Sequence, residues 1–157
     1  MPVPARRRPI ELFAALAIAG CFHGGLLLAG SYRRTYDAYV HLFFADHYRR
    51  SWFSTWEPRW YTGFTTVSYP PGSHQLLATV SRVVGLDDAF PVVALAAMLL
   101  LVVGVYRFSC LWVSPRAAGY AALLAAASSS LAETLHVFGQ LPTLLSLSFL
   151  LNGLPFA

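Results

Sequence analysis

The chain has 157 residues, of which 57% are hydrophobic and 11% are charged, and its formal net charge is +4 at pH 7. A soluble domain carries about 25% charged residues, so these values exclude an ordinary soluble protein and indicate the bilayer as solvent. All eleven basic residues are arginines scattered beside apolar stretches, which argues against a nucleic-acid-binding protein. The composition predicts an all-α fold, that of a polytopic helical membrane protein.

The first predicted membrane span covers residues 10–31 and follows Arg6, Arg7 and Arg8 in a short N-terminus, residues 1–9. About 20 apolar residues suffice to cross the hydrocarbon layer as a helix. A cleaved signal peptide has the same order of basic and then apolar residues. This apolar stretch is long for a signal peptide, so an uncleaved anchor is favoured. The arginines then keep the N-terminus in the cytoplasm.

Residues 32–88 form the predicted first extracytoplasmic loop, with juxtamembrane helices over about 36–50 and 71–85. The second helix is short and carries polar side chains, among them His74 and Arg82. A helix lying on the outer surface is therefore favoured over a membrane span. If this segment did span the membrane, every later segment would change sides.

One face of the helix over 36–50 gathers an acid, a histidine and two aromatic rings. At about 100° per residue, the residues that share this face are Asp37, His41, Phe44 and Tyr48. Asp46 and Arg50 lie elsewhere, with the i,i+4 spacing typical of a surface ion pair, and His47 is expected to be interfacial. Asp37 is left without a local partner. It is either a helix-start acid, with Thr35 as the N-cap, or a functional carboxylate.

Aromatic rings and turn-forming residues follow in the stretch SWFSTWEPRWYTGFTTVSYPPGSH. Its three tryptophans and Tyr61 are amphipathic rings suited to the headgroup layer, so an aromatic belt is one interpretation. The prolines and glycines predict tight, ordered turns, which is the other interpretation. Arg59 lies among the tryptophans, and a guanidinium binds phosphate by paired hydrogen bonds.

Three further apolar segments are predicted to cross the membrane: 89–106, 117–132 and the stretch 141–157. A cytoplasmic turn, 107–116, joins the first two, and an outer loop, 133–140, precedes the last. The small residues of the middle segment favour close helix packing in lipid. Because the chain stops inside an apolar segment, we expect it to be the N-terminal portion of a longer membrane protein.

Few polar side chains lie within the apolar segments. Cys21 and Cys110 lie in or beside apolar stretches without CxxC spacing, so both are expected to be small buried side chains. His23 is the one mid-membrane candidate for an ion path, and no charged residue accompanies it. A channel or transporter fragment is therefore disfavoured.

The segment YDAYVHLFFADHYRRSWFSTWEPRWYTGFTTVSYPPGSH carries three motifs in order. They are an Asp and a His soon after the first span, a W-x-P-x-W element at 56–60, and an aromatic-Pro-Pro element at 69–71 followed by His74. With these motifs the chain resembles the GT-C superfamily of integral-membrane glycosyltransferases in its first extracytoplasmic loop. It is most similar to bacterial and archaeal membrane proteins labelled as related to 6-pyruvoyl-tetrahydropterin synthase, a label that does not indicate pterin chemistry. The sequence GQLPTLL, from Gly139, also recurs in such proteins, and the resemblance covers the front of a typical member.

This resemblance implies a site for sugar transfer from a polyprenyl-phosphate donor. The acid that faces the donor in that superfamily falls on Asp37, and a carboxylate there can take the proton of an acceptor hydroxyl. A single base suffices for inversion at the sugar carbon. Arg59 or Arg82 is expected to stabilise the leaving phosphate. The residues expected to bind substrate are His41, Arg59, Tyr61, His74 and Arg82.

The resemblance also implies a divalent metal, because some members bind one between acids of their first two outer loops. Glu133 and His136 are spaced i,i+3 in the second loop of this chain. Asp37, Glu133 and His136 are therefore the candidate ligands of Mg²⁺ or Mn²⁺. The alternative for the last two is an ordinary polar helix end at the membrane interface.

Sugar transfer outside the cytoplasm is the leading functional hypothesis, by a multi-pass protein of the cell membrane whose N-terminus is cytoplasmic. Its expected partners are membrane lipids, the lipid-linked sugar donor and the rest of the polypeptide, with no nucleic acid among them. The alternative is a non-catalytic membrane protein that binds lipid or polysaccharide, or serves as an assembly subunit.

Overall fold

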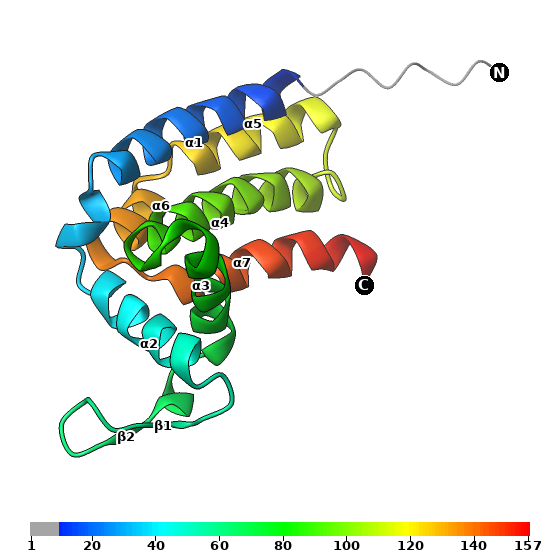
Figure 1. The fold of residues 1–157 in the computed structure, drawn as a ribbon. Helices are drawn as coiled ribbons and strands as arrows, with labels where there is room; N and C mark the ends of the chain where they lie inside the picture. The colour runs from blue at the N-terminus through cyan, green and yellow to red at the C-terminus, as the bar shows by residue number, and fades with distance from the viewer. Residues whose placement is uncertain (1–9) are drawn as a thin grey trace.

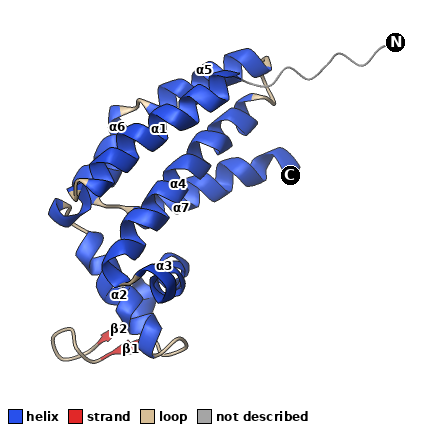
Figure 2. Ribbon diagram, turned by 45° about the horizontal axis from the view of Figure 1, so that its top comes forward, coloured by secondary structure: helices blue, strands red, loops and turns tan. Residues whose placement is uncertain are grey.

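The computed structural model describes residues 10–157, and Figure 1 shows the path of the chain. The cytoplasmic N-terminus expected at residues 1–9, with its three arginines, lies outside the described residues. Within 10–157 the fold is all-α, because the strands are only two residues long (Figure 2). The helices are α1 (Ile10–Leu28), α2 (Ala38–Arg50), α3 (Pro71–Val84), α4 (Leu86–Ser109), α5 (Pro115–Ala126), α6 (Ser129–Glu133) and α7 (Leu141–Gly153), with the 3-10 turns η1 (Ser31–Arg34), η2 (Thr66–Ser68) and η4 (Leu154–Phe156) and the π-helical turn η3 (Thr134–Phe138).

Helices α1, α4, α5 and α7 pack side by side as a bundle, and α2, α3 and a small hairpin extend from one end of it (Figure 1). α1 and α4 are each long and apolar enough to cross a membrane, and the bent pair of α5 with α6 and η3 makes a third if it is taken as one span. The remaining apolar helix, α7, is shorter. The end of the bundle that carries η1, η3 and the start of α2 is named the α2 end.

The third predicted span, 117–132, is not one continuous helix. α5 stops at Ala126, and α6 begins after Ser128, whose hydroxyl caps it through a backbone N–H at 3.4 Å. A serine that caps a new helix competes with continuation of the old one, and the two parts meet at a bend of 44°. The expected outer loop, 133–140, is also largely helical, because η3 continues α6 as far as Gly139.

Small residues bring the helices of the bundle close together, as the composition of 117–132 predicts. A side chain on Gly119 of α5 would collide with Glu11 of α1. Gly104 of α4 lies as close to α7, where an added Cβ would be 2.7 Å from the side-chain nitrogen of Asn152. Close backbone approach of this kind stabilises helix pairs in an apolar environment. The buried alanines between α1 and α5 are Ala15, Ala19, Ala122 and Ala126.

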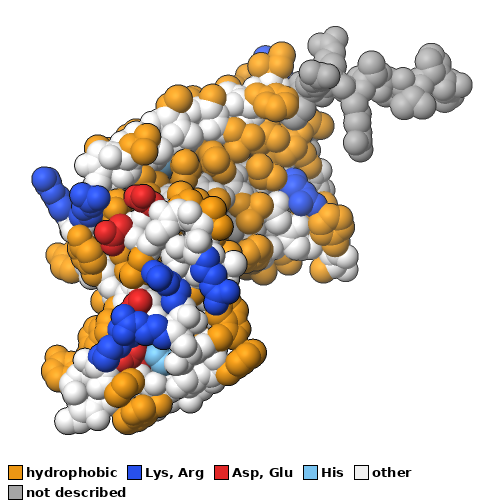
Figure 3. Space-filling view, viewed as in Figure 1, with side chains coloured by type: hydrophobic (Ala, Val, Ile, Leu, Met, Phe, Trp, Pro, Cys, Tyr) orange, Lys and Arg blue, Asp and Glu red, His pale blue; other side chains and the backbone are white. Residues whose placement is uncertain are grey.

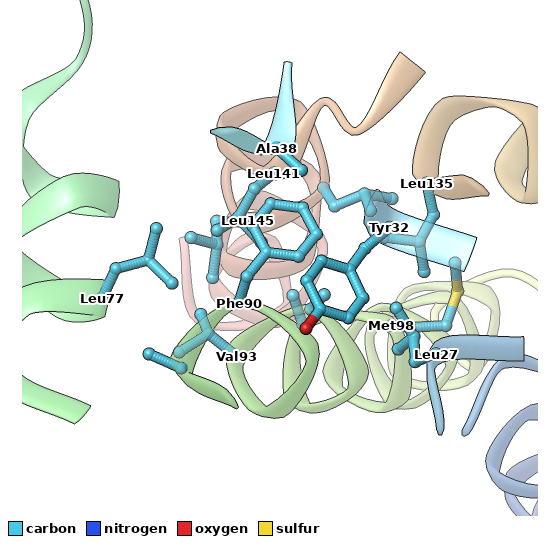
Figure 4. Packing of buried hydrophobic residues seen from close by; sticks show 14 of the residues in the cluster. Leu27, Tyr32, Ala38, Leu77, Phe90, Val93, Met98, Leu135, Leu141 and Leu145 are labelled. Atoms are coloured by element: carbon cyan, nitrogen blue, oxygen red, sulfur yellow. The ribbon is translucent and has the colours of Figure 1, made fainter. Parts of the chain in front are cut away.

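A second apolar cluster joins the bundle to α2 and α3 (Figure 4). Its centre is Phe90 of α4, which is fully buried and stacks on Tyr32 of η1 with ring centroids 5.7 Å apart. Burial of one such side chain contributes about 1.5–3 kcal/mol, so this cluster holds η1, α2 and α3 against the bundle. The leucines around the two rings come from α3, η3 and α7 and are Leu77, Leu135, Leu141 and Leu145.

Two segments distant in sequence are joined at the α2 end. The backbone N–H of Asp37 donates to the carbonyl of Phe138 at 3.0 Å, and the preceding residue makes the equivalent bond. Gly139 follows with φ +71°, and an added Cβ there would lie 2.5 Å from the hydroxyl of Thr35. The start of α2 and the segment before α7 therefore form one unit, which places the two predicted outer loops at the same end of the bundle.

The stretch between α2 and α3 folds into ordered turns, as its prolines and glycines predict, and adds a hairpin that the sequence did not indicate. β1 (Trp56–Glu57) and β2 (Phe64–Thr65) pair antiparallel. Gly63 has φ +108° and packs against the ring of Trp56, where a side chain would collide. Trp60 stacks on an aromatic ring of α2 with centroids 6.1 Å apart, which fixes the hairpin to that helix.

Candidate functional site

Asp37 immediately precedes α2 at the α2 end. Thr35 caps the helix, because its hydroxyl accepts the backbone N–H of Ala38 at 3.2 Å. The Asp37 carboxylate makes no capping bond and, among residues 10–157, no other hydrogen bond or ion pair. Of the three acids between residues 35 and 60, Asp46 and Glu57 are held in ion pairs with arginines. Asp37 is therefore the acid of this segment that is free to act on a ligand.

His41, one turn further along α2, faces His74 of α3. The Nδ1 atom of His41 and the Nε2 atom of His74 are 3.0 Å apart, and the two side chains are 2% and 0% exposed. Their outer nitrogens, Nε2 of His41 and Nδ1 of His74, have no hydrogen-bond partner in the described part of the chain. Buried polar atoms are nearly always paired, so these two nitrogens are exceptions. Because it ends on an unpaired nitrogen at each side, the pair of His41 and His74 is named the open pair. The structure thus brings together two predicted substrate-binding residues.

Burial keeps both rings of this open pair neutral. Desolvation, with a smaller contribution from His41, lowers the pKa of His74 to about 3. Desolvation also lowers the pKa of His41, against the opposing effects of the Asp37 carboxylate and the Gly139 backbone. Two neutral rings joined by one hydrogen bond carry an N–H at one outer end and a lone pair at the other, whichever ring donates. The open pair can therefore donate a hydrogen bond at one end and accept one at the other.

A charged network joins the hairpin to α2. Glu57 is 1% exposed and accepts hydrogen bonds from the guanidinium of Arg59 at 2.7 Å and from Nδ1 of His47 at 3.0 Å. The Arg59 side chain lowers the pKa of Glu57 to about 2, against the opposing effect of burial. Asp46 bonds both Arg59 and Arg50 at 2.7 Å, which includes the predicted i,i+4 pair. His47 is therefore buried rather than interfacial, and two carboxylates already neutralise Arg59.

Two more residues were predicted to bind substrate, one in the hairpin and one on α3, the helix that also carries His74. Tyr61 occupies the hairpin turn with φ +52° and is 92% exposed. Arg82 of α3 lies over the ring of Trp52, 6.0 Å from its centroid. In the described residues neither side chain contacts Asp37 or the open histidine pair.

A second histidine pair was not expected from the sequence. His23 of α1 and His136 of η3 lie with Nδ1 and Nε2 2.9 Å apart. His23 donates from Nε2 to the carbonyl of Ala126 at 3.2 Å, so in the neutral ring its Nδ1 accepts. His136 then donates from Nε2, and its Nδ1 accepts the hydroxyl of Ser31 at 2.8 Å. Every ring nitrogen of this closed pair has a partner, and no local signal reveals it, because its members are 113 positions apart.

The predicted metal ligands do not assemble into a site. Within residues 10–157, no group of three His, Cys, Asp or Glu side chains is placed to hold a metal ion. Asp37, Glu133 and His136 lie at the same end of the bundle, but the π-helical turn directs His136 toward His23 and Ser31. Glu133 is exposed, so it does not share the surroundings of His136.

The two cysteines are free thiols. Both were expected to be buried, and neither is. Cys21 is exposed on α1, and Cys110, just after α4, is partly exposed. The buried stripe of α1 runs through Ala15, Ala19 and His23. Because these residues recur every fourth position on one face of the helix, Cys21 lies outside the packed stripe.

Comparison with protein-family models, with curated proteins and with solved structures gives no match for this chain. Fold and site together define an all-α protein with helices fit to cross a membrane, which carries a free carboxylate beside an open histidine pair. Function is therefore argued from the chemistry of that site.

Proposed function

We propose that the chain is a GT-C-like membrane glycosyltransferase, or the part of one that carries its catalytic acid. It moves a sugar from a polyprenyl-phosphate donor to an extracytoplasmic acceptor. The protein is a multi-pass protein of the cell membrane, with a cytoplasmic N-terminus and with the α2 end outside. Its partners are membrane lipids, the lipid-linked donor and the rest of the polypeptide.

The observation that carries this proposal is the free carboxylate of Asp37. Asp46 and Glu57 lie nearby in sequence, yet arginines neutralise both. A carboxylate without an ion-pair partner is free to accept a hydrogen bond from an acceptor hydroxyl, as a general base must. Its position at the polar end of an apolar bundle is where a lipid-linked sugar would meet a water-borne acceptor.

In the proposed step, the oxygen of the acceptor hydroxyl bonds to the anomeric carbon while the bond from that carbon to the phosphate oxygen breaks. The acceptor proton passes to Asp37, and the phosphate leaves with the bonding electrons. The outer nitrogen of His41 hydrogen-bonds a sugar or acceptor hydroxyl, and His74 sets which nitrogen of His41 carries the proton. Arg82 is the remaining arginine candidate for the leaving phosphate, because two carboxylates occupy Arg59.

An Asp37→Asn variant tests the proposal. Membranes containing the full-length protein, since residues 1–157 alone are expected to be inactive, are given polyprenyl phosphate carrying a radiolabelled sugar, mannose or glucose, and label in extracytoplasmic glycan or lipid is counted. Loss of the base should lower transfer by about 10²- to 10⁴-fold. Asp46→Asn is the matched control, because it removes a carboxylate of the same helix that already has partners. Equal transfer by wild-type protein and the Asp37→Asn variant, with both inserted in the membrane, contradicts the proposal.

A non-catalytic binding protein is the second candidate, and the hairpin region favours it. Phe53 and Tyr61 are each 92% exposed, and exposed rings of this kind suit sugar faces or lipid headgroups. Alanine at both positions should then abolish binding to polysaccharide-coated beads or to lipid vesicles. This outcome, together with unchanged transfer in Asp37→Asn, favours the binding protein over the enzyme.

A further inference from the structure

A groove of about 750 Å³ runs between α1 and the first half of α4, within the range of about 300–1,000 Å³ typical of ligand sites. The α1 side of the groove is open beside two glycines, because a Cβ added at Gly20 or Gly25 would meet no atom within 4 Å. Leucines and Cys21 of α1, apolar side chains of α4 and Val84 at the end of α3 line the rest. Asp88 is the one charged residue that lines this groove.

A smaller cavity of about 160 Å³ adjoins the groove at the α2 end. It shares Leu27, Leu28, Asp88 and Pro91 with the groove and adds Arg33. The Nε of Arg33 donates to the hydroxyl of Tyr32 at 3.2 Å, which directs the guanidinium. The mouth of an apolar groove is therefore lined by one cation, Arg33, and one anion, Asp88, and the charge of Asp87 also acts on Arg33. Figure 3 shows basic and acidic side chains next to each other at this end of the bundle.

We infer that this groove binds one acyl chain of a phosphatidylethanolamine molecule, with the lipid phosphate on Arg33 and its ammonium group on Asp88. Guanidinium groups bind phosphate oxygens by paired hydrogen bonds, and a carboxylate accepts hydrogen bonds from an ammonium group. The acyl chain fills the space that the missing glycine side chains leave.

The two opposite charges select this headgroup over others. A lipid whose only charge is a phosphate, such as phosphatidylglycerol or a polyprenyl phosphate, would satisfy Arg33 but would face repulsion from Asp88. Phosphatidylcholine has no N–H to donate to the carboxylate. A packed helix from a second copy would fill the groove but would leave both charges without a specific partner.

This lipid site is independent of the proposed sugar transfer. The groove lies along α1 and α4 and meets α3 only at its last residue, Val84, whereas Asp37 and the open histidine pair lie at the start of α2 and in the first turns of α2 and α3. Phe90 lies between them. Its ring stacks on Tyr32, which lines the mouth of the groove, and also stacks on His41 of the open pair, with ring centroids 6.4 Å apart. Loss of the lipid site and loss of transfer are therefore separate outcomes.

Cys21 offers a direct measurement, because it lines the groove and is a free thiol. The purified protein is placed in nanodiscs of phosphatidylcholine, alone or with phosphatidylethanolamine, phosphatidylglycerol or undecaprenyl phosphate. Alkylation of each cysteine by N-ethylmaleimide is followed by mass spectrometry. Phosphatidylethanolamine should slow alkylation of Cys21 roughly fivefold or more. A fivefold reduction of the unoccupied fraction is expected when the lipid concentration is about four times its Kd. Cys110, outside the groove, is the internal control and should react equally in every disc.

Variants identify the headgroup contacts. Asp88→Asn and Arg33→Gln should each abolish the protection of Cys21 by phosphatidylethanolamine, whereas Arg34→Gln, beside the mouth, and the conservative Asp88→Glu should retain it. Equal alkylation in all four lipid mixtures overturns the proposal. Protection by phosphatidylglycerol or undecaprenyl phosphate that survives Asp88→Asn also overturns it, since it indicates a site for phosphate alone. Protection that depends on protein concentration rather than on lipid indicates a second copy and overturns it as well.

Discussion

The two histidine pairs use the same side chains at nearly the same separation, yet their surroundings differ. The closed pair, His23 and His136, lies 2.9 Å apart and ends on a serine hydroxyl and a backbone carbonyl. The open pair, His41 and His74, lies 3.0 Å apart and ends on no partner among residues 10–157. The closed pair ties α1 to η3 within the bundle, and the open pair ties α2 to α3 beside Asp37.

This difference separates a structural network from a candidate site. A fully satisfied buried network stabilises and orders the elements that it joins. A buried polar atom left without a partner costs about 1–3 kcal/mol, so two of them, one at each end of the pair, reduce stability unless a ligand or water completes them. The open pair is therefore where a bound hydroxyl gains most, which agrees with its place beside the free carboxylate.

The largest expected effect comes from breaking the closed pair. His136→Phe keeps the ring but leaves Nδ1 of His23 and the hydroxyl of Ser31 without partners, so we expect a loss of about 2–3 kcal/mol. Thermal unfolding in detergent should show a drop in Tm of roughly 5–10 °C. Glu133→Gln is the control, because it changes an exposed side chain three positions before His136. It should shift stability by less than about 0.5 kcal/mol. An unchanged Tm in His136→Phe would show that the closed pair is not structural.

An intermediate effect should follow acidification. The folded-state pKa of His74 is about 3, below the unfolded value of about 6.5, so between these values the unfolded chain binds more protons. Stability is then fully present above about pH 6.5 and falls as pH decreases, by about 1 kcal/mol per pH unit for this group. Unfolding should be measured from about pH 7 to pH 5, where most carboxylates remain ionised.

His74→Phe provides the control for this pH dependence. The variant lacks the group that binds the extra proton on unfolding, so its stability should fall less steeply over the same pH range than that of the wild-type protein. Identical slopes would mean that the open pair is not buried as a neutral pair.

The smallest expected effect on stability is that of replacing the whole open pair. The double variant His41→Phe and His74→Phe removes both unpartnered nitrogens and keeps apolar rings in place, so its stability should stay within about 1 kcal/mol of wild type. Sugar transfer, measured as for Asp37→Asn, should nevertheless fall well below wild type. A large loss of stability would place this pair in the same structural class as the closed pair.

Much of the bundle could be predicted from local patterns. The apolar runs of α1 and α4 are visible as uninterrupted sequence, and the small residues of α5 predicted close helix packing, although not which helix would be its neighbour. The i,i+4 pair of Asp46 and Arg50 was also accessible, because helical spacing alone brings such residues together. The break after Ala126 was not predicted, since Ser128 acts as a cap only when the chain turns there.

The three residues of the candidate site were named from the sequence, but their geometry was not predicted. Asp37, His41 and His74 were identified from motif spacing and resemblance, whereas the contact between the two histidines depends on how α3 packs on α2. That Arg59 is neutralised could not be predicted from the sequence either. It depends on the fold of the hairpin, which buries Glu57 and pairs it with Arg59.

The sequence by itself determined an all-α chain with helices fit for a membrane, because hydrophobic length and helical period are properties of consecutive residues. Only the tertiary structure decided which polar groups are satisfied. That outcome depends on partners far apart in the chain, such as Ser31 with His136, and on burial, which makes an unpaired nitrogen costly. The distinction between a closed and an open histidine pair, and with it the choice of candidate site, arises at that level.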